Sequence, residues 1–441
     1  MQNQKYGFFT AISMVVGIVI GSGIFFKADD ILIATGGSVI LGVLGFLVVG
    51  IGVLFGSLVI SEYAINNPEE GGVIPFAKDA FGPNVAFFVS WFMIAVYFPA
   101  LIVILAFVTS IYLSVLLGID SSTFIYVATV VLLICAFVIN ITSKRLGGII
   151  QTLATGLKLI PLFVIGFMGL MFWGNSGDVV SASSDAISNG GFMSALIAIA
   201  FTFDGWIIVT SIGGEIKNPK RTLPFALSFG VLFTVIIYSL YFIGITNIVS
   251  PSEIISLGDG HVDVAAKAIF GNSGSTIITS FVVIAVYGGL NGMVLAYLRL
   301  PHAIISQGMM KDVLNIEDEL GNTGFAKRTI VFEAIIVAIV LAFHILVSEQ
   351  ILFGNLETPF DISTLPIIAI YIVYIGLYLK VFKVTKRTGN KRKVLALYVV
   401  LATLISLVVI YGALQVNGLL YIIVSLIIVA LGYPLLNKSS N

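Results

Sequence analysis

Small residues interrupt the first long apolar segment of the chain at Gly21, Ser22 and Gly23. If one helix ends near Ile20 and another begins near Ile24, the second presents free backbone N–H groups and the positive end of its dipole. Both features favour a carboxylate, as does the Ser22 hydroxyl, and glycine lets a ligand approach the backbone. The unpaired carbonyls that end the first helix suit an ammonium group.

A second interruption, Phe201-Thr202-Phe203-Asp204-Gly205-Trp206, lies inside another apolar segment far along the chain. Non-helical backbone is tolerated at membrane depth only beside protein or a wet cavity. Two interrupted segments in corresponding places are typical of a transporter site. The second break therefore favours a binding site over the alternative for the first, a small-residue packing face. Phe201 and Phe203 either line this site or pack as ordinary aromatic residues.

Asp204 and Lys158 are the charged residues predicted to lie deepest in the membrane. Asp204 has three interpretations: an N-cap of the next half-helix, a contact to a substrate ammonium, or a member of another ion pair. Lys158 lies about ten residues, or roughly 15 Å, from the nearer end of its segment. Its ammonium can stand where a sodium ion would sit and hold the carbonyls of the first break. It can instead release its proton, or form a structural ion pair such as one with Asp204.

The composition indicates an all-α integral membrane protein, because 59% of the 441 residues are hydrophobic and only 10% are charged. Apolar runs of about 20 residues recur, each long enough to cross about 30 Å of hydrocarbon, and no alternating strand pattern appears. The sequence predicts twelve spans, at 8–28, 38–63, 84–115, 124–141, 148–173, 191–213, 224–248, 275–306, 328–347, 363–383, 394–414 and 418–435.

Charge distribution predicts the orientation. Eighteen lysine and arginine residues are predicted on the side of the membrane where the N-terminus lies, and only Lys27 and Lys267 on the opposite side. The positive-inside rule therefore predicts that both termini are cytoplasmic. The short polar N-terminus has no cleavable signal, so we expect the first span to stay in the membrane.

Spans 1–5 and 6–10 form two sets of five. An odd number per set makes the second set enter from the opposite face, as an inverted repeat requires, and pairs the broken first span with the broken sixth. The predicted divisions are a first repeat at 1–173, a second at 174–384, and two further spans with the C-terminus at 385–441.

Other chemistry is not indicated. The chain has no G-x-x-x-x-G-K-[ST] motif for ATP, its three histidines are scattered, and no nucleophile–base pair suggests an enzyme. We expect no metal, no cofactor and, with zero net charge, no nucleic-acid partner. Residues 281–286, in the eighth predicted span, offer no pair of hydroxyl groups that could bind a sodium ion, which argues against sodium coupling. Glu62 and Glu333, near span ends, are expected to be wetted by solvent.

Several motifs resemble those of the amino acid–polyamine–organocation superfamily. They are Gly-Ser-Gly-Ile-Phe at 21–25, Glu70-Gly71-Gly72 followed by Phe81-Gly82, Gly214-Glu215-Ile216-Lys217-Asn218-Pro219 with Pro224, and Gly288-Gly289-Leu290-Asn291 with Arg299. The chain looks most like a bacterial member of the L-amino acid transporter family. This resemblance implies a LeuT-like five-plus-five fold, sodium independence and amino-acid exchange.

The resemblance also implies residue roles. Ser22 and Gly23 would bind the substrate carboxylate, and the carbonyls of Val19, Phe201 and Asp204 its amine. Phe201 would be the gating aromatic residue, and Lys158 would match a lysine that replaces sodium in some members.

Two departures from the family pattern matter. Asp204 stands where some members have glycine, so its side-chain role is open. The loop at 117–122 has no cysteine, and the chain's only cysteine is Cys135 in an apolar span. No disulfide-linked heavy chain is therefore expected.

These observations predict a secondary transporter in the cell membrane that exchanges neutral, small L-amino acids by alternating access, with the amino acid and membrane lipids as its partners. Proton symport, with Lys158 releasing the proton, is one alternative. A non-transporting membrane sensor is another, disfavoured because no signalling domain is attached. The predicted substrate-binding residues are Val19, Ile20, Gly21, Ser22, Gly23, Ile24, Phe201, Thr202, Phe203 and Asp204.

Overall fold

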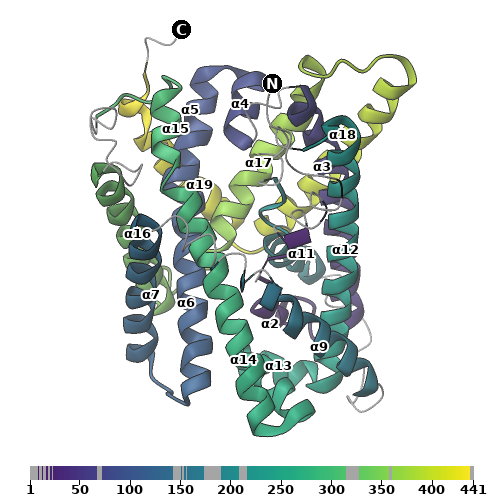
Figure 1. Ribbon diagram of the computed structural model, residues 1–441, viewed down its shortest axis with the longest axis vertical. Coiled ribbons are helices and arrows are strands. Elements are labelled where there is room, and N and C mark those ends of the chain that lie inside the picture. The colour runs from purple at the N-terminus through teal and green to yellow at the C-terminus, as the bar shows by residue number, and fades with distance from the viewer. Residues whose placement is uncertain are drawn as a thin grey trace. The chain divides into compact units, whose positions relative to one another are not determined.

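The computed structural model contains helices joined by turns and loops in the part of the chain that it describes, and no strand there beyond isolated bridge residues such as Met310 and Leu436 (Figure 1). This confirms the predicted all-α class. The residues described are 8, 12, 16–17, 20–21, 23–66, 72–142, 150, 153–154, 156–172, 190–207, 216–313, 327–356 and 360–437.

Within those ranges, nine helical stretches are long and apolar enough to cross a membrane. They match nine predicted spans: the second to fourth and the seventh to twelfth. Their bounds are Val39–Asn66, Pro83–Leu117, Ser122–Thr142, Lys220–Ile248, Pro251–Ser306, Lys327–Ser348, Thr364–Lys383, Gly389–Leu414 and Gly418–Leu435.

The first, fifth and sixth predicted spans contain shorter pieces. The first holds the 3₁₀ turn η1 (Gly23–Phe25) and the start of α2 (Ala28–Ala34). The fifth holds α9 (Leu159–Gly169), and the sixth holds α11 (Gly191–Thr202). In the eighth, the long helix α14 (His261–Tyr297) loses helical geometry at Gly271, close to the predicted start at 275.

One compact unit comprises residues 1–82, 162–261 and 367–416. In it α3 (Val39–Asn66) packs against α12 (Pro219–Ile248), α18 (Gly389–Leu414) and α11. The α3–α12 contact depends on glycine, because a Cβ on Gly42 would lie 2.4 Å from the ring of Phe242 and one on Gly50 would lie 2.2 Å from Val235. No real Cβ approaches that closely, so the two helices are packed backbone to side chain.

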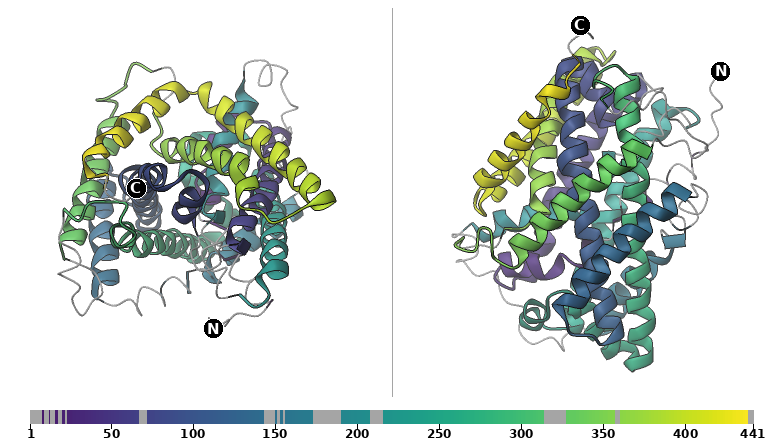
Figure 2. Two further views of the ribbon diagram at one scale, coloured as in Figure 1. Left: turned by 90° about the horizontal axis from the view of Figure 1, so that it is seen from above. Right: turned by 90° about the vertical axis from the view of Figure 1, so that its left-hand side faces the viewer.

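The other unit comprises residues 83–161, 262–366 and 417–441. Its helix α6 (Phe98–Leu117) packs against α7 (Ser122–Thr142) and α16 (Lys327–Ser348), and α6 and α7 run side by side in Figure 2. Helix α19 (Gly418–Leu431) packs against α5 (Pro83–Phe92) and the π-helical turn η2 (Met93–Tyr97). Each unit contains segments from all three predicted divisions. The units group residues that contact one another in space, whereas the predicted repeats are consecutive stretches of the sequence. The repeat boundaries stay a prediction.

The expectation that Glu62 and Glu333 are wetted is wrong. Glu62 is 3% exposed, accepts a hydrogen bond from the Thr385 hydroxyl at 2.7 Å and forms an ion pair with Arg387 at 2.6 Å. Glu333 is 0% exposed. Position along a span suggested solvent for both, but the surrounding helices cover them.

Candidate binding site

The first break separates helical residues 16–17 from the turn η1. The backbone N–H of Ile20 still donates to the carbonyl of Val16 at 3.0 Å, which closes the last turn before the break. Residues 20–21 are not helical, η1 follows, and α2 begins only after Lys27. The break predicted from Gly21 and Gly23 is therefore confirmed.

The second break is a tight turn at the end of α11. The N–H of Asp204 donates to the carbonyl of Phe201 at 3.1 Å, and Gly205 follows with φ of 92°. That left-handed conformation favours glycine because a Cβ there is strained. Trp206 then packs against Tyr374 with ring centroids 5.1 Å apart. The break predicted in the sixth span is thus confirmed as well.

The two breaks touch each other although they are far apart in sequence. A Cβ on Gly21 would lie 3.7 Å from the carbonyl oxygen of Thr202. One on Gly23 would lie 3.1 Å from the ring of Phe201, tighter than most real contacts. Backbone polar groups of both breaks are therefore gathered in one buried region.

Tyr238 of α12 connects the two breaks. Its hydroxyl oxygen accepts the N–H of Gly21 at 2.9 Å, and the hydroxyl lies 3.1 Å from the carbonyl oxygen of Thr202 and 3.3 Å from that of Gly21. Its single proton serves one of these carbonyls at a time. Tyr238 is fully buried, so these are its means of satisfying the phenol. Sequence analysis missed it. The available signal was a tyrosine in the middle of an apolar span, which needs a partner.

The two phenylalanines of the second break have different surroundings. The Phe201 ring lies against Gly23 and 5.6 Å from the ring of Phe26, edge to face. The Phe203 ring is 5.4 Å from Tyr238 and 6.4 Å from Phe46, and it is 0% exposed. These contacts favour a site role for Phe201 and a packing role for Phe203.

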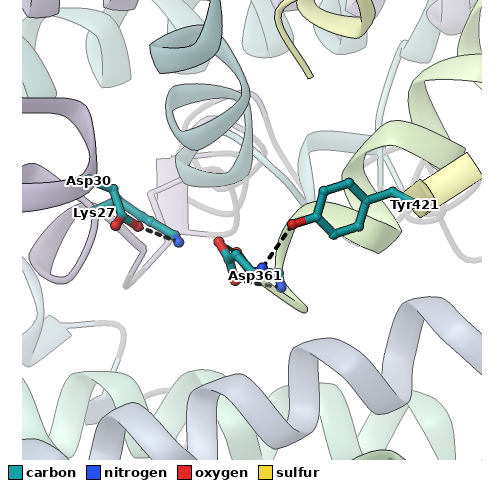
Figure 3. Close-up of polar contacts among 5 residues, drawn as sticks. Lys27, Asp30, Asp361 and Tyr421 are labelled. Carbon is teal, nitrogen blue, oxygen red and sulfur yellow. Dashed lines mark hydrogen bonds and ion pairs between the residues drawn. The ribbon is translucent and has the colours of Figure 1, made fainter. Parts of the chain in front are cut away.

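Lys27 is buried beside Phe201, which the sequence did not indicate. It is 5% exposed, and its ammonium forms an ion pair with Asp30 at 2.6 Å (Figure 3). The same ammonium lies 5.5 Å from the Phe201 ring centroid. A cation at that distance from an aromatic face is attracted to it. Lys27 therefore restrains the ring at the edge of the first break.

Figure 3 also shows Asp361, which belongs to the other unit. Its N–H donates to the Tyr421 hydroxyl at 2.8 Å, and its carboxylate accepts the N–H of Ser363 at 2.8 Å. These bonds shape the turn before α17 (Thr364–Lys380). Asp361 therefore has a structural role at a helix start.

Lys158 is buried, as predicted, at 7% exposure. The backbone N–H of Lys158 donates to the carbonyl of Ala154 at 2.9 Å. Ala154 packs so closely on α14 that a Cβ on Gly288 would lie 2.0 Å from its own Cβ. Lys158 is therefore held one turn from a tight helix contact.

Val19 and Ser22 lie outside the described residues. Asp204 is half-buried and interacts electrostatically with Tyr371 of α17. Among the described residues, no three His, Cys, Asp or Glu side chains are grouped to hold a metal ion.

Comparisons with known proteins fit this geometry. Residues 6–434 match the family model described as amino acid permease. The serine/threonine exchanger SteT of Bacillus subtilis (strain 168) is 32% identical over 391 residues, which cover 88% of this chain and 85% of SteT. The b(0,+)-type amino acid transporter 1 of Oryctolagus cuniculus is 28% identical over 327 residues, covering 71% and 65% respectively.

Among solved structures, the crystal structure of MhsT in complex with L-phenylalanine is similar, with a TM-score of 0.63 over 92% of this chain and 98% of that one. The sequence identity is 13%, so this likeness concerns the fold alone. It supports the predicted LeuT-like arrangement of broken helices.

Proposed function

Since the chain belongs to the amino acid permease family, we propose that it exchanges neutral, small L-amino acids across the cytoplasmic membrane without sodium. Its family and relatives make it a multi-pass amino acid transporter and not an enzyme. The finer choice of substrate is supported by SteT, which is named a serine/threonine exchanger. The observation that carries the proposal is the contact between the two helix breaks at Gly21 and Thr202.

We propose that the first break binds the substrate carboxylate. Tyr238 already occupies the N–H of Gly21. The proposed donors to the carboxylate are therefore the next N–H groups along the chain, at Ser22 and Gly23, with the Ser22 hydroxyl. The first N–H groups of a helical turn have no partner within the turn. Amide donors of this kind form charge-assisted bonds to a carboxylate.

The substrate amine is proposed to meet the carbonyls of Val19, Phe201 and Asp204. The Phe201 carbonyl lies in the turn of the second break, where it accepts the backbone N–H groups of Phe203 and Asp204, so an ammonium group would have to compete with or displace these bonds. Ile20, Ile24 and Thr202 would line the same region through backbone atoms. Phe201, restrained by Phe26 and Lys27, would be the aromatic gate.

Lys158 is proposed as a fixed positive charge that takes the place of sodium in the mechanism. Its burial supports a role, because a charge inside a membrane protein is costly to retain. The alternative, release of its proton during symport, makes a different prediction for a pH gradient. Both termini are proposed to be cytoplasmic from the lysine and arginine bias, and no disulfide-linked heavy chain is proposed.

Exchange in proteoliposomes tests the proposal. Purified protein should take up labelled serine or threonine strongly when the liposomes contain unlabelled amino acid, and weakly when they are empty. Replacing sodium with choline should change little. Equal uptake into empty and loaded liposomes would contradict exchange, a large loss without sodium would contradict sodium independence, and dependence on an inward proton gradient would favour symport.

A further inference from the structure

Glu333 is an isolated carboxyl group on the inward face of α16. The buried residues of this helix recur every third or fourth position, and Glu333 lies on the resulting stripe with Thr329, Val337 and Leu341. The flanking Lys327 and Arg328 are exposed. Glu333 is six residues after Lys327, so it lies about 9 Å along the helix from the exposed helix start.

Neither carboxyl oxygen of Glu333 has a hydrogen-bond partner among the described residues. The hydroxyl of Thr329, one turn away on the same stripe, also has none there. A buried polar side chain without partners is uncommon in folded proteins and calls for an explanation. A lone ionised carboxylate in an apolar interior is so unfavourable that the group takes a proton instead.

The third span and α19 bring no positive charge to Glu333. Residues 83–117, which form α5, η2 and α6, contain no Asp, Glu, Lys or Arg, and neither does α19. Phe332 contacts Trp91 of α5, and α16 packs on α6. On α14 the group that interacts electrostatically with Glu333 is Tyr297. The other titratable groups on α16 are Lys327 and Arg328, exposed at its start, and His344, about 16 Å along it. On α14, His261, Asp263, Lys267 and Tyr287 lie at least ten residues, or about 15 Å, before Tyr297, and Arg299 is exposed two residues after it.

Tyr297 links Glu333 to an irregular part of the third span. It is fully buried, and its hydroxyl donates to the carbonyl of Ile94 at 2.8 Å. Ile94 lies in the π-helical turn Met93–Tyr97, a type of irregularity that is frequent at functional sites. The Tyr297 hydroxyl has one proton, so it cannot donate to Ile94 and to a Glu333 carboxylate at once.

We propose that Glu333 is a proton-binding site within the membrane, protonated at neutral pH, and that loss of its proton draws the Tyr297 hydroxyl away from Ile94. A metal cation is not suited to the site, because it needs several oxygen ligands and Glu333 has apolar neighbours. Proton release would thus be coupled to the geometry of the third span. This inference goes beyond the proposed exchange and does not depend on its substrate.

Infrared spectroscopy of reconstituted protein tests the protonation state directly. The wild type at neutral pH should show a neutral carboxylic acid band that is absent from Glu333→Gln, a variant with the size and hydrogen-bonding capacity of the neutral acid. Glu62→Gln is the matched control: Glu62 is equally buried but paired with Arg387 and Thr385, so its removal should take away no such band. Identical neutral-acid bands in wild type and Glu333→Gln would overturn the proposal.

Titration of that band tests the role of Tyr297. Raising the pH should abolish the band in the wild type. In Tyr297→Phe the carboxylate loses its donor, so the band should persist to higher pH. A band that never titrates across the pH range of transport, or an unchanged midpoint in Tyr297→Phe, would overturn the switch.

Transport gives the functional readout. Exchange by the wild type should fall several-fold as the band disappears, whereas Glu333→Gln, which stays neutral, should retain its exchange. Superimposable pH profiles would refute the role of Glu333 while leaving amino-acid exchange intact. If neither protein exchanged any amino acid, the proposed function would fail, and the infrared result would still decide the protonation of Glu333.

Discussion

Both helix breaks interrupt an apolar helix and expose backbone polar groups, but different kinds of residue form them. The first uses small residues and is tied by Tyr238, which bonds the backbone of Gly21. The second closes on itself through the bond from Asp204 to Phe201 and a left-handed Gly205, with large aromatic side chains on both sides of the turn. The comparison suggests a division of labour, in which the first break would supply the donors for a carboxylate, and the second would supply carbonyls for an amine and the aromatic side chains that shape the site.

The largest test asks whether a buried charge outside the two breaks in the sequence is needed for transport. Lys158→Ala should reduce transport per folded molecule sharply, by at least tenfold. The substitution removes the fixed positive charge that is proposed to take the place of sodium, and alanine cannot replace that charge. Uptake and exchange should be measured with and without a pH gradient. A fixed charge predicts that both fall and that the gradient matters little, whereas a proton carrier predicts gradient dependence and surviving exchange.

Unchanged transport by Lys158→Ala, normalised to folded protein, would remove Lys158 from the mechanism. Lower thermal stability with intact transport would assign it to a structural ion pair.

Ser22→Val tests whether the first break binds the carboxylate. The substitution removes a donor and crowds the N–H groups, and a lost charge-assisted bond is worth about 1.5–3 kcal/mol, or roughly ten- to a hundredfold in affinity. Competition assays should show this loss, and amino-acid amides should compete poorly with the wild type. Wild-type affinity in the variant, or equal competition by amides, would contradict carboxylate binding at the first break.

Tyr238→Phe tests the link between the breaks. It leaves the N–H of Gly21 and the carbonyl of Thr202 without their partner, at a cost of about 1–3 kcal/mol for a buried unpaired group. Thermal unfolding in detergent should reveal this destabilisation. Tyr241→Phe is the control, one turn along α12, since the Tyr241 hydroxyl has no hydrogen-bond partner among the described residues. Equal effects of the two substitutions would mean that Tyr238 acts only through packing.

Gly205→Ala is the smallest and most local test, directed at the turn of the second break. A left-handed conformation costs an ordinary residue roughly 1–2 kcal/mol, so the variant should unfold at lower temperature. Gly156→Ala provides the comparison, because a Cβ there meets nothing within 4 Å and the backbone is helical. If both variants were equally stable, the turn would not need glycine.

The sequence predicted what depends on local pattern. Apolar runs located the spans, and small residues within them located both breaks, because these features are contained in a few neighbouring residues. It could not predict that the Tyr238 hydroxyl accepts a hydrogen bond from Gly21, 217 positions away, or that the Thr385 hydroxyl donates one to Glu62, 323 positions away. It also assigned Glu62 and Glu333 to solvent and gave no sign that Lys27 is buried, because a position near a span end does not reveal which face of the helix is inward.

The glycine contact between α3 and α12 limits how this protein can diverge. Phe242 cannot swing away from a new Cβ at Gly42, because its ring is 0% exposed and lies 5.6 Å from that of Phe46. Positions 42 and 242 should therefore change together: relatives with a larger residue at the first should carry a smaller one at the second. An alignment of relatives would show this as covariation between two helices, and directed evolution would reach such variants only through paired substitutions.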